Sequence, residues 1–408
     1  MRIWIINHYA LPYDNAGGTR HANFAKQLIK YGHEITIFAA NYNHFAHSYI
    51  QTNTVLGEID SRYQIPFMWI PTGSYRGNTL ARLWNMLSFS IRLLQKKYTA
   101  HLPPPDVILG SSPHLFAAFS ASILAKRFNV PFLLEVRDIW PDSLAEHFSK
   151  YHPLFYLMKK IECKLYKDAH QIISLLPGIK DYLIHLSVAE EKIVWIPNTI
   201  DPDLYPSSIC DQQSKKFTIM YAGAHGILND LDICLDAAKL LQNTEIGEKI
   251  RICLIGNGPE KKRLIERTIK EKIQIIQFLD PVPKTKIYTI LSQADVFLMP
   301  LKHSTIYRFG ISPNKLFDYL LMSRPIIFAV NTSFNPVELN NAGITIPPSN
   351  SRALADAISQ LFSTPENVRK MMGERGKEYV YSHHHIERMC KKLETILRAI
   401  QNKELTAT

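Results

Sequence analysis

The alternation of short apolar runs with helical segments constrains this chain more than any other feature of its sequence. An apolar run at Arg2–Ile6 leads through the glycine pair Gly17-Gly18 to a predicted helix over Thr19–Tyr31, and a second apolar run follows at Glu34–Ala39. A strand, a turn, a helix and a strand form a βαβ unit, in which the two strands lie parallel in one sheet. We therefore predict an α/β fold.

The same alternation starts again at the predicted strand Phe217–Ala222, after the polar segment Ser207–Lys216. A chain of 408 residues is also long for a single core. We predict two doubly wound, Rossmann-like domains, one over residues 1–206 and one over residues 207–382. A last helix at about residues 383–403 is expected to pack back on the first domain. Loops at the strand ends of the two domains would face each other across a cleft, which is the usual place for a ligand.

Composition and charge narrow the classes of protein to consider. The net charge is +11 with a pI near 9.2, and no Asp or Glu occurs between Ser61 and Pro105. Basic proteins often bind phosphorylated ligands, anionic lipid or nucleic acid. No apolar run free of charge reaches about 18 residues, so we expect no transmembrane helix. Five cysteines without pairing or metal spacing favour a reducing cytosol.

A predicted helix over Thr79–Tyr98 carries charges of only one sign. Its apolar positions have helical spacing and are Leu80, Leu83, Trp84, Leu87, Ile91 and Leu94. A basic amphipathic helix is typical of a protein that lies on an anionic membrane surface. A core-facing helix with a basic outer face would show the same spacing, and the acid-free surroundings favour the membrane. The predicted membrane contacts are Arg82, Trp84, Arg92, Lys96 and Lys97.

The stretch Ile311–Ile326 (ISPNKLFDYLLMSRPI) predicts a loop followed by the start of a helix. Ser312 fits the N-cap position, and Pro313 fits the first helical position, where its missing N–H has no cost. The helix is expected to run from about residue 314 to residue 322. Free backbone N–H groups and the positive helix end would then favour an anion at the loop.

Two side chains on this predicted helix extend the anion site. Lys315 adds a mobile cation, and Asp318 can accept a hydrogen bond from a sugar hydroxyl. The pair suits a diphosphate beside a ribose. An ordinary solvated ion pair on a helix would have the same spacing.

Three adjacent histidines, His383, His384 and His385, invite a metal interpretation. Neighbouring residues on a helix point in different directions and cannot converge on one ion. We predict no metal site there and no cofactor, and we expect this segment to cross between the domains.

Several motifs, in order over nearly the whole chain, resemble those of family 4 glycosyltransferases with the GT-B fold. They are Gly17-Gly18-Thr19-Arg20, the strand after Gly32-His33-Glu34, Arg137-Asp138-Ile139-Trp140-Pro141, Ile196-Pro197-Asn198-Thr199-Ile200-Asp201, Tyr221-Ala222-Gly223, Gly256-Asn257-Gly258-Pro259, Ala294-Asp295-Val296 and Ser312-Pro313-Asn314-Lys315-Leu316-Phe317-Asp318-Tyr319-Leu320. Within the family, the chain is similar to the bacterial polysaccharide branch that transfers N-acetylated amino sugars such as fucosamine.

The resemblance implies retaining transfer from a nucleotide sugar without a bound metal. In the family, an acid on the helix after the phosphate loop holds the ribose, and Asp318 occupies that position. The implied donor-binding residues are Asp318, Lys315, Asn314, Pro313, Ser312, Gly223, His225, Gly18 and Gly17. The catalytic candidates are Asp138 and Arg137, and the acceptor-binding candidates are Arg20 and Trp140.

The chain also departs from the family. Gly310 stands where a second glutamate often contacts the donor sugar. Ala224, His225 and Asn229 occupy the region of a usual arginine and lysine, and Arg137 stands where a histidine commonly precedes the aspartate. Phosphate charge must then be met by helix ends and by other cations, of which the candidates are Lys315, Arg308 and Arg20.

The predicted function is transfer of a sugar, in particular an N-acetylated amino sugar, from a UDP-linked donor to a polyprenyl-diphosphate-linked acceptor. Such a reaction belongs to the synthesis of surface polysaccharide, such as O-antigen or lipopolysaccharide. We expect a cytoplasmic protein on the inner face of the cell membrane. A nucleotide-sugar 2-epimerase of the same fold is the alternative, and acceptor-dependent release of UDP would separate the two. No RNA-type aromatic platform or zinc motif supports nucleic-acid binding.

Overall fold

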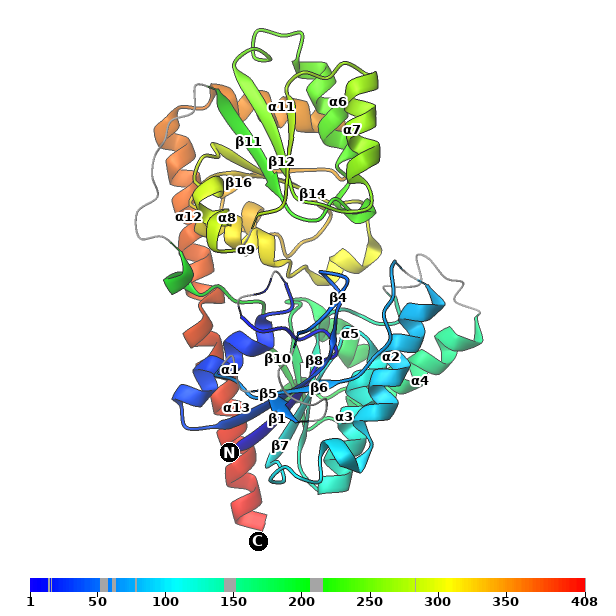
Figure 1. Ribbon diagram of the computed structural model, residues 1–408. Coiled ribbons are helices and arrows are strands. Elements are labelled where there is room, and N and C mark those ends of the chain that lie inside the picture. Colours follow the sequence, from blue (N-terminus) through cyan, green and yellow to red (C-terminus); the bar gives the residue numbers. More distant parts are fainter. Residues whose placement is uncertain are drawn as a thin grey trace. The chain divides into compact units, whose positions relative to one another are not determined.

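The computed structural model describes residues 1–13, 15, 17–51, 58–60, 64–77, 79–142, 152–205, 216–282 and 284–407. The chain divides into two units. The first unit consists of Met1–Pro197 and Ile386–Thr408, and the second consists of Asn198–His385. Figure 1 shows a separate sheet with its own helices in each unit.

The second unit begins at Asn198, earlier than the predicted boundary after residue 206. The backbone N–H of Asn198 donates to Ser312 Oγ at 3.1 Å, and the Tyr205 hydroxyl donates to Asp318 Oδ1 at 2.5 Å. Residues 198–205 therefore pack as part of the second unit. Of the predicted linker Ser207–Lys216, all but the last residue lies outside the described residues.

The first unit is built on a sheet with the strand order β10-β9-β8-β7-β1-β2-β6-β5. The strands are β1 (Arg2–Ile6), β2 (Glu34–Ala40), β5 (Ile59–Asp60), β6 (Phe67–Ile70), β7 (Val107–Ser111), β8 (Phe132–Val136), β9 (Gln171–Ser174) and β10 (Ile193–Trp195). All neighbours run parallel except β5, which is antiparallel to β6. A small antiparallel pair, β3 (Tyr42–Asn43) and β4 (Ser48–Tyr49), follows β2.

Helices pack against this sheet and complete the first unit. They are α1 (Arg20–Lys30), α2 (Leu80–Leu93), α3 (Leu115–Phe128), α4 (Pro153–Asp168), α5 (Ile179–His185) and α13 (Ile386–Ala407), with single turns of 3-10 helix at Lys96–Tyr98 and Glu190–Lys192. Ile5 of β1, Phe24 of α1 and Leu393 of α13 share one hydrophobic core. The last helix of the chain thus packs in the first unit, beside α1.

The second unit has a six-stranded parallel sheet in the order β13-β12-β11-β14-β15-β16. The strands are β11 (Phe217–Ala222), β12 (Ile250–Ile255), β13 (Ile276–Leu279), β14 (Val296–Pro300), β15 (Ile326–Ala329) and β16 (Gly343–Ile346). Its helices are α6 (Asp232–Leu241), α7 (Lys261–Lys270), α8 (Lys284–Leu291), α9 (Asn314–Leu321), α10 (Pro336–Leu339), α11 (Ser351–Ser363) and α12 (Glu366–His384), with 3-10 turns at Pro202–Leu204, Ile227–Asn229 and Thr305–Phe309.

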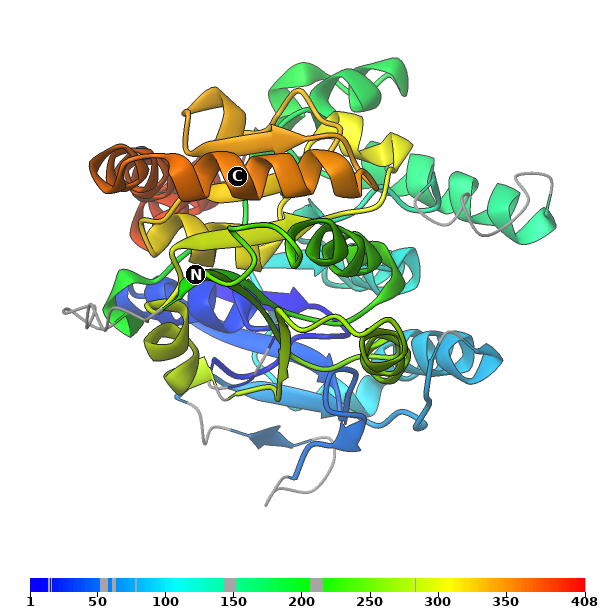
Figure 2. The ribbon, with the colours of Figure 1, turned by 90° about the horizontal axis from the view of Figure 1, so that it is seen from above.

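Both faces of the second sheet are covered by helices (Figures 1 and 2). Ile219 and Tyr221 of β11 pack into one core with α6, α7 and α11, whereas Met220 packs into the other core with α8, α9 and α12. Alternate residues of a strand point to opposite faces, so a strand buried on both sides reads as a continuous apolar run. The predicted doubly wound α/β fold is confirmed.

Helix α2 does not turn its whole apolar stripe toward the core, as the core-facing alternative required. The apolar positions Leu80, Trp84 and Ile91 are 84%, 64% and 58% exposed. The buried face consists of Asn85, Met86, Ser88, Phe89, Ser90 and Leu93. Small serines let α2 approach α3 closely, and the Ser120 hydroxyl of α3 donates to the Ser90 carbonyl at 3.1 Å. Among the described residues, no helix combines the length and the apolarity that crossing a bilayer requires.

Candidate functional site

The ammonium group of Lys315 lies at the carboxyl end of β11. It donates to the Tyr221 hydroxyl at 3.0 Å and to Asn229 Oδ1 at 2.6 Å. Burial lowers the pKa of Lys315 to about 8. Within the described ranges, Lys315 forms no ion pair with a carboxylate. A half-buried cation with neutral partners favours the arrival of an anion.

Gly223 gives this ammonium group room. A Cβ at Gly223 would lie 3.1 Å from Lys315 Nζ and 3.0 Å from the Tyr221 hydroxyl, so any side chain there would crowd the cation. The backbone of the following loop is held in place, because His225 N donates to the Asn257 carbonyl at 2.8 Å. Gly258 packs directly on the His225 backbone, where a Cβ would come within 2.4 Å of the carbonyl oxygen.

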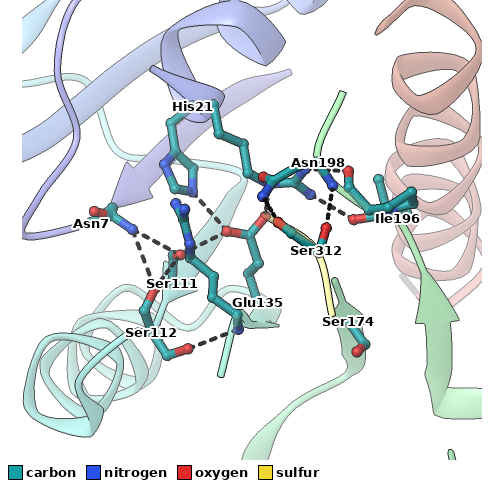
Figure 3. Close-up of polar contacts among 12 residues, drawn as sticks. Asn7, His21, Ser111, Ser112, Glu135, Ser174, Ile196, Asn198 and Ser312 are labelled. Carbon is teal, nitrogen blue, oxygen red and sulfur yellow. Dashed lines mark hydrogen bonds and ion pairs between the residues drawn. The ribbon is translucent and has the colours of Figure 1, made fainter. Parts of the chain in front are cut away.

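The start of α9 differs from the sequence prediction. Pro313, and not Ser312, is the N-cap, and Asn314 is the first helical residue. The Ser312 hydroxyl instead accepts the backbone N–H of Asn198, and the Ser312 carbonyl accepts Asn198 Nδ2 at 2.6 Å (Figure 3). The N-cap Pro313 makes no side-chain hydrogen bond to the first turn of α9, and the Leu316 N–H donates to the Pro313 carbonyl at 3.1 Å. The N–H groups of Asn314 and Lys315 lie at a helix start, a position that favours an anion.

Asp318 is held by two phenols. Tyr205 and Tyr288 both donate to Oδ1, at 2.5 and 3.4 Å, and their ring centroids lie 4.0 Å apart. Burial, followed by the charge of Asp318, raises the pKa of both tyrosines, which therefore remain donors at neutral pH. Lys315 and Asp318 are three residues apart on α9, a spacing that places side chains on one face of a helix.

The His225 side chain points into the second unit. It is fully buried beside Tyr221 and Phe278, and neither ring nitrogen has a hydrogen-bond partner among the residues that the structure describes. Burial, followed by the charge of Lys261, lowers the pKa of His225 to about 4, so the ring is neutral. The loop presents backbone, rather than this imidazole, at its surface.

Arg20 is buried in the first unit and fully engaged there. Its Nε donates to Glu135 Oε2 at 2.8 Å, its Nη2 donates to the Ile196 carbonyl at 2.8 Å, and its Nη1 donates to the Pro197 carbonyl. Both members of the Arg20–Glu135 ion pair have side chains only 4% exposed. The arrangement is that of a structural anchor, whereas the sequence suggested acceptor contact.

Glu135 is a buried acid that sequence reasoning missed. It also accepts from His21 Nε2 at 2.9 Å and from the Ser111 hydroxyl at 2.7 Å (Figure 3). Burial alone would raise the pKa of Glu135, but the charge of Arg20 and the contact with His21 hold it well below its usual range. The only signal in the sequence is one acid within the apolar strand Phe132–Val136.

The Gly17-Gly18 turn lies close to the carboxyl end of β1. Both glycines have positive φ, at 84° and 67°. A Cβ at Gly18 would come within 2.5 Å of the Tyr9 carbonyl oxygen, and one at Gly17 would meet the Phe45 ring at 3.1 Å. The turn requires glycine for both its backbone conformation and its packing.

Arg137, Asp138 and Trp140 occupy the loop after β8. Arg137 N donates to the Ser112 hydroxyl at 2.9 Å, and Trp140 N donates to the Asp138 carbonyl at 3.1 Å. The Asp138 side chain is exposed, and the other two are half-buried. The structure thus brings the two predicted catalytic residues together at the carboxyl end of the first sheet.

A second group at this end of the first sheet was also missed. We call His8, Tyr9, His44, Tyr75 and His114 the histidine–tyrosine cluster. Its members stack on one another, and His8 Nδ1 lies 2.6 Å from His114 Nε2. The run Asn7-His8-Tyr9 directly after the first strand was the available signal.

The predicted membrane residues fall into two sets. Trp84, Arg92, Lys96 and Lys97 are exposed on α2 and the turn after it. Arg82 is only half-exposed, and its Nη2 lies 3.5 Å from the Tyr9 hydroxyl. Residues two positions apart on a helix point in nearly opposite directions. Trp84 is exposed, and Arg82 therefore points the other way and lies beside the histidine–tyrosine cluster.

The three adjacent histidines have different surroundings. His384 is buried, stacks on Phe317 of α9 at 3.8 Å between ring centroids and contacts the Asn198 carbonyl through Nδ1 at 2.8 Å. His383 packs on Tyr379. Within the described part of the chain, no group of three or more His, Cys, Asp or Glu is placed to hold a metal.

The two halves of the chain match two glycosyltransferase family models. Residues 17–204 match the model described as Glycosyltransferase Family 4, and residues 216–364 match the model described as Glycosyl transferases group 1. Together with the two doubly wound sheets, these matches define the class: the chain is built as a glycosyltransferase of the GT-B fold. This result does not favour the epimerase alternative.

Two curated glycosyltransferases are similar to parts of the chain. The chain is 24% identical over 174 residues to a colanic acid biosynthesis glycosyltransferase, WcaL, of Salmonella typhimurium, and 24% identical over 161 residues to an alpha-D-kanosaminyltransferase of Streptomyces kanamyceticus. The matches cover 42% and 38% of this chain, and 42% and 39% of the two relatives. The chain therefore matches about two fifths of the length of each.

Solved structures share the fold over nearly the whole chain. Sucrose-phosphate synthase from Thermosynechococcus elongatus has a TM-score of 0.78 at 13% identity and covers 98% of this chain and 99% of its own. HepE of Anabaena, in complex with UDP and glucose, has a TM-score of 0.70 at 15% identity and covers 98% of this chain and 100% of its own.

Proposed function

We propose that this protein transfers a sugar from a UDP-linked donor to a lipid-linked acceptor, with retention of configuration and without a metal. The observation that carries the proposal is the arrangement of Lys315, Gly223 and the uncapped start of α9, with Asp318 one turn further along. A cation, free N–H groups and an acceptor carboxylate on one helix suit a diphosphate next to a ribose. The UDP-bound relative of this fold supports the choice of nucleotide.

The two charged side chains of the donor site, Lys315 and Asp318, then each have an assigned partner. The Lys315 ammonium neutralises the donor diphosphate, and the diphosphate in turn keeps Lys315 protonated. The first-turn N–H groups at Asn314 and Lys315 donate to phosphate oxygens. Asp318, positioned by its two tyrosines, accepts from the ribose hydroxyls. Ser312 and Pro313 set the position of this loop through the contacts with Asn198.

The chemistry needs little covalent participation by the protein. The bond between the sugar C1 and the diphosphate oxygen breaks, and the acceptor oxygen forms a new bond to C1 on the same face. The acceptor hydroxyl loses its proton to the departing phosphate. The protein stabilises charge on the leaving group and orients both substrates. We assign Asp138 to the acceptor hydroxyl and Arg137 to positioning Asp138.

We further propose an N-acetylated amino sugar as the donor sugar, in surface polysaccharide synthesis. The support is the family resemblance of the motifs and the partial similarity to a relative whose name refers to colanic acid biosynthesis. A substrate screen with UDP-N-acetylglucosamine, UDP-N-acetylgalactosamine and UDP-glucose tests this proposal. Protection of the fold by UDP-glucose alone would contradict it.

The exposed face of α2 supports binding to the cytoplasmic face of an anionic membrane. Large exposed apolar residues on a soluble surface mark interaction sites, and here basic residues surround them. Removing the charges of Arg92, Lys96 and Lys97 should release the protein from phosphatidylglycerol vesicles in a sedimentation assay. Removing three cations elsewhere, at Lys262, Lys270 and Arg352, provides the control. Equal loss in the two triple variants would contradict a specific membrane face.

A thermal-shift titration with UDP, GDP and their sugar conjugates, in EDTA, tests the donor site. A ligand that binds the folded state raises the melting temperature. We expect UDP to stabilise the wild type, and Asp318→Ala and Lys315→Ala to lose most of that shift. Lys262→Ala, an exposed change on α7, should keep it. A wild type that no nucleotide stabilises would overturn the proposed donor site.

A further inference from the structure

The histidine–tyrosine cluster lies where ligands bind in parallel α/β sheets. His8 and Tyr9 follow β1, His44 follows β3 just after β2, Tyr75 follows β6, and His114 follows β7. The carboxyl ends of parallel strands meet at one edge of the sheet, which is the usual ligand edge. The cluster is therefore placed at the ligand-binding edge of the first unit, and the donor site described above does not involve it.

The cluster is a packed aromatic group in which His8, Tyr75 and His114 are buried, whereas Tyr9 and His44 are half-buried. The Tyr9 ring stacks on His8 with centroids 4.5 Å apart and meets His114 edge-on at 5.7 Å. His44 stacks on Tyr75 at 5.7 Å, and its Nδ1 lies 2.8 Å from the Tyr75 hydroxyl. Rings that support one another in this way are pre-organised, so a ligand would not have to order them on binding.

Arg82 supplies the positive charge beside this cluster. Its Nη2 lies 3.5 Å from the Tyr9 hydroxyl, and its guanidinium carbon lies 6.0 Å from the Tyr9 ring centroid. Burial, and then the charge of Arg82, lowers the pKa of His44 to about 4 and that of His114 to about 3. The imidazoles are thus neutral at physiological pH, and the charge of the cluster is that of the guanidinium.

Helix α2 carries this cation on one side and exposed apolar residues on the other. A helix rotates by about 100° per residue, so Arg82 points about 160° away from both Leu80 and Trp84. Leu80, Trp84 and Ile91 form the exposed stripe. One helix thus carries a half-buried cation beside the aromatic cluster on one side and an apolar stripe suited to lipid on the other.

We propose that Arg82, with Tyr9 and His44 on the half-buried side of the histidine–tyrosine cluster, binds the diphosphate of a prenyl-diphosphate-linked sugar, while the exposed stripe of α2 enters the membrane that holds the prenyl chain. The inference rests on the proposed function and specifies which part of the acceptor is recognised and by which residues. A guanidinium matches two phosphate oxygens, and the tyrosine hydroxyl beside it is a further donor.

Farnesyl diphosphate, a soluble short-chain probe, tests the inference by isothermal titration with the full chain. Arg82→Gln should weaken its binding about tenfold, equivalent to about 1.4 kcal/mol. Arg127→Gln, an exposed change on neighbouring α3, should leave the binding within about twofold of wild type, a difference of under about 0.5 kcal/mol. Arg82→Lys keeps the charge but loses the planar guanidinium, so its affinity for farnesyl diphosphate should lie between those of the two glutamine variants. This variant also provides the test if Arg82→Gln does not fold.

The two diphosphate sites are separated by a crossed comparison. The Arg82→Gln variant should bind farnesyl diphosphate more weakly and UDP as the wild type does. The Lys315→Ala variant should bind UDP more weakly and farnesyl diphosphate as the wild type does. Absence of saturable farnesyl diphosphate binding in a wild type that binds UDP would overturn this inference and leave the transferase proposal intact. Equal losses in Arg82→Gln and Arg127→Gln would also overturn it, because they would show an unspecific effect of charge. Failure of UDP alone would count against the donor site only.

Discussion

The Tyr205 hydroxyl donates a 2.5 Å hydrogen bond to Asp318 Oδ1, joining the first residues of the second unit to the carboxylate proposed to hold the ribose. Tyr288 donates to the same oxygen from α8. The carboxylate is thereby held in one orientation before any ligand arrives. Pre-organisation of this kind lowers the entropy cost of binding.

Removing the hydroxyl groups of both tyrosines should weaken UDP binding while leaving the fold intact. A hydrogen bond to a charged group contributes about 1.5–3 kcal/mol, so Tyr205→Phe with Tyr288→Phe should raise the Kd about tenfold or more. Tyr381→Phe, on the exposed side of α12, is the matched control. Titration calorimetry measures the effect, and an unchanged Kd in the double variant would show that Asp318 needs no clamp.

Lys315 predicts a decline of UDP affinity above pH 8. Its pKa in the folded protein is about 8, so the cation is lost from the free protein as the pH rises through that value. Each further pH unit should then weaken binding by up to about tenfold. Lys315→Arg keeps its charge and should make UDP affinity nearly independent of pH. Lys315→Met should bind UDP weakly, with the same affinity at every pH.

The same shift affects stability with the opposite sign. The folded pKa of Lys315 lies below its unfolded value, so the unfolded chain binds the proton more tightly. The charge of Lys315 lowers the free energy of unfolding by its full amount below about pH 8. This destabilisation lessens as the pH rises toward about 10.5, the pKa of lysine in the unfolded chain. Urea unfolding of wild type and Lys315→Met should therefore differ most at pH 7 and converge at high pH. A difference that grows with pH would contradict the assignment.

Glu135→Gln should destabilise the first unit strongly. The change leaves the buried Arg20 guanidinium without its counter-charge, and breaking a buried ion pair costs about 3–5 kcal/mol. Asp356→Asn, which breaks the exposed pair with Arg352, should cost less than about 1 kcal/mol. Chemical denaturation compares the two variants. Similar losses would show that Arg20 and Glu135 are solvated like a surface pair.

Gly18→Ala should cost more than Gly32→Ala, although both glycines have positive φ. Alanine at positive φ costs about 1 kcal/mol or more at either position. At Gly18 the added Cβ would also come within 2.5 Å of the Tyr9 carbonyl oxygen, whereas at Gly32 it would meet nothing within 4 Å. The difference in melting temperature between the two variants isolates the steric part.

The sequence was informative where a contact is local. Lys315 and Asp318 share a face of α9 because of their spacing, and the apolar runs at β14 and β15 are typical of strands buried on both sides. Asp138 could be placed at a strand end for the same reason. Local periodicity carried each of these predictions.

What sequence reasoning missed depends on partners far apart in the chain. Glu135 looks like an exception within an apolar strand until Arg20, 115 residues earlier, is seen beside it. Ser312 reads as an N-cap, yet its hydroxyl accepts from Asn198 instead. The apolar stripe of α2 faces outward because the serine-rich face packs on α3. Helical spacing identifies an apolar stripe but does not decide what covers it.

The packing of α13 in the first unit has a consequence for how the protein is made. Met389 and Leu393 of α13 belong to a core whose buried residues outside this helix lie in the first half of the chain, and His33 contacts Glu394. During synthesis, most of the first unit emerges from the ribosome early, but α13 follows only after the whole second unit has been made. The nascent chain can therefore finish its second unit before its first, reversing the usual N-terminal-first order of domain folding.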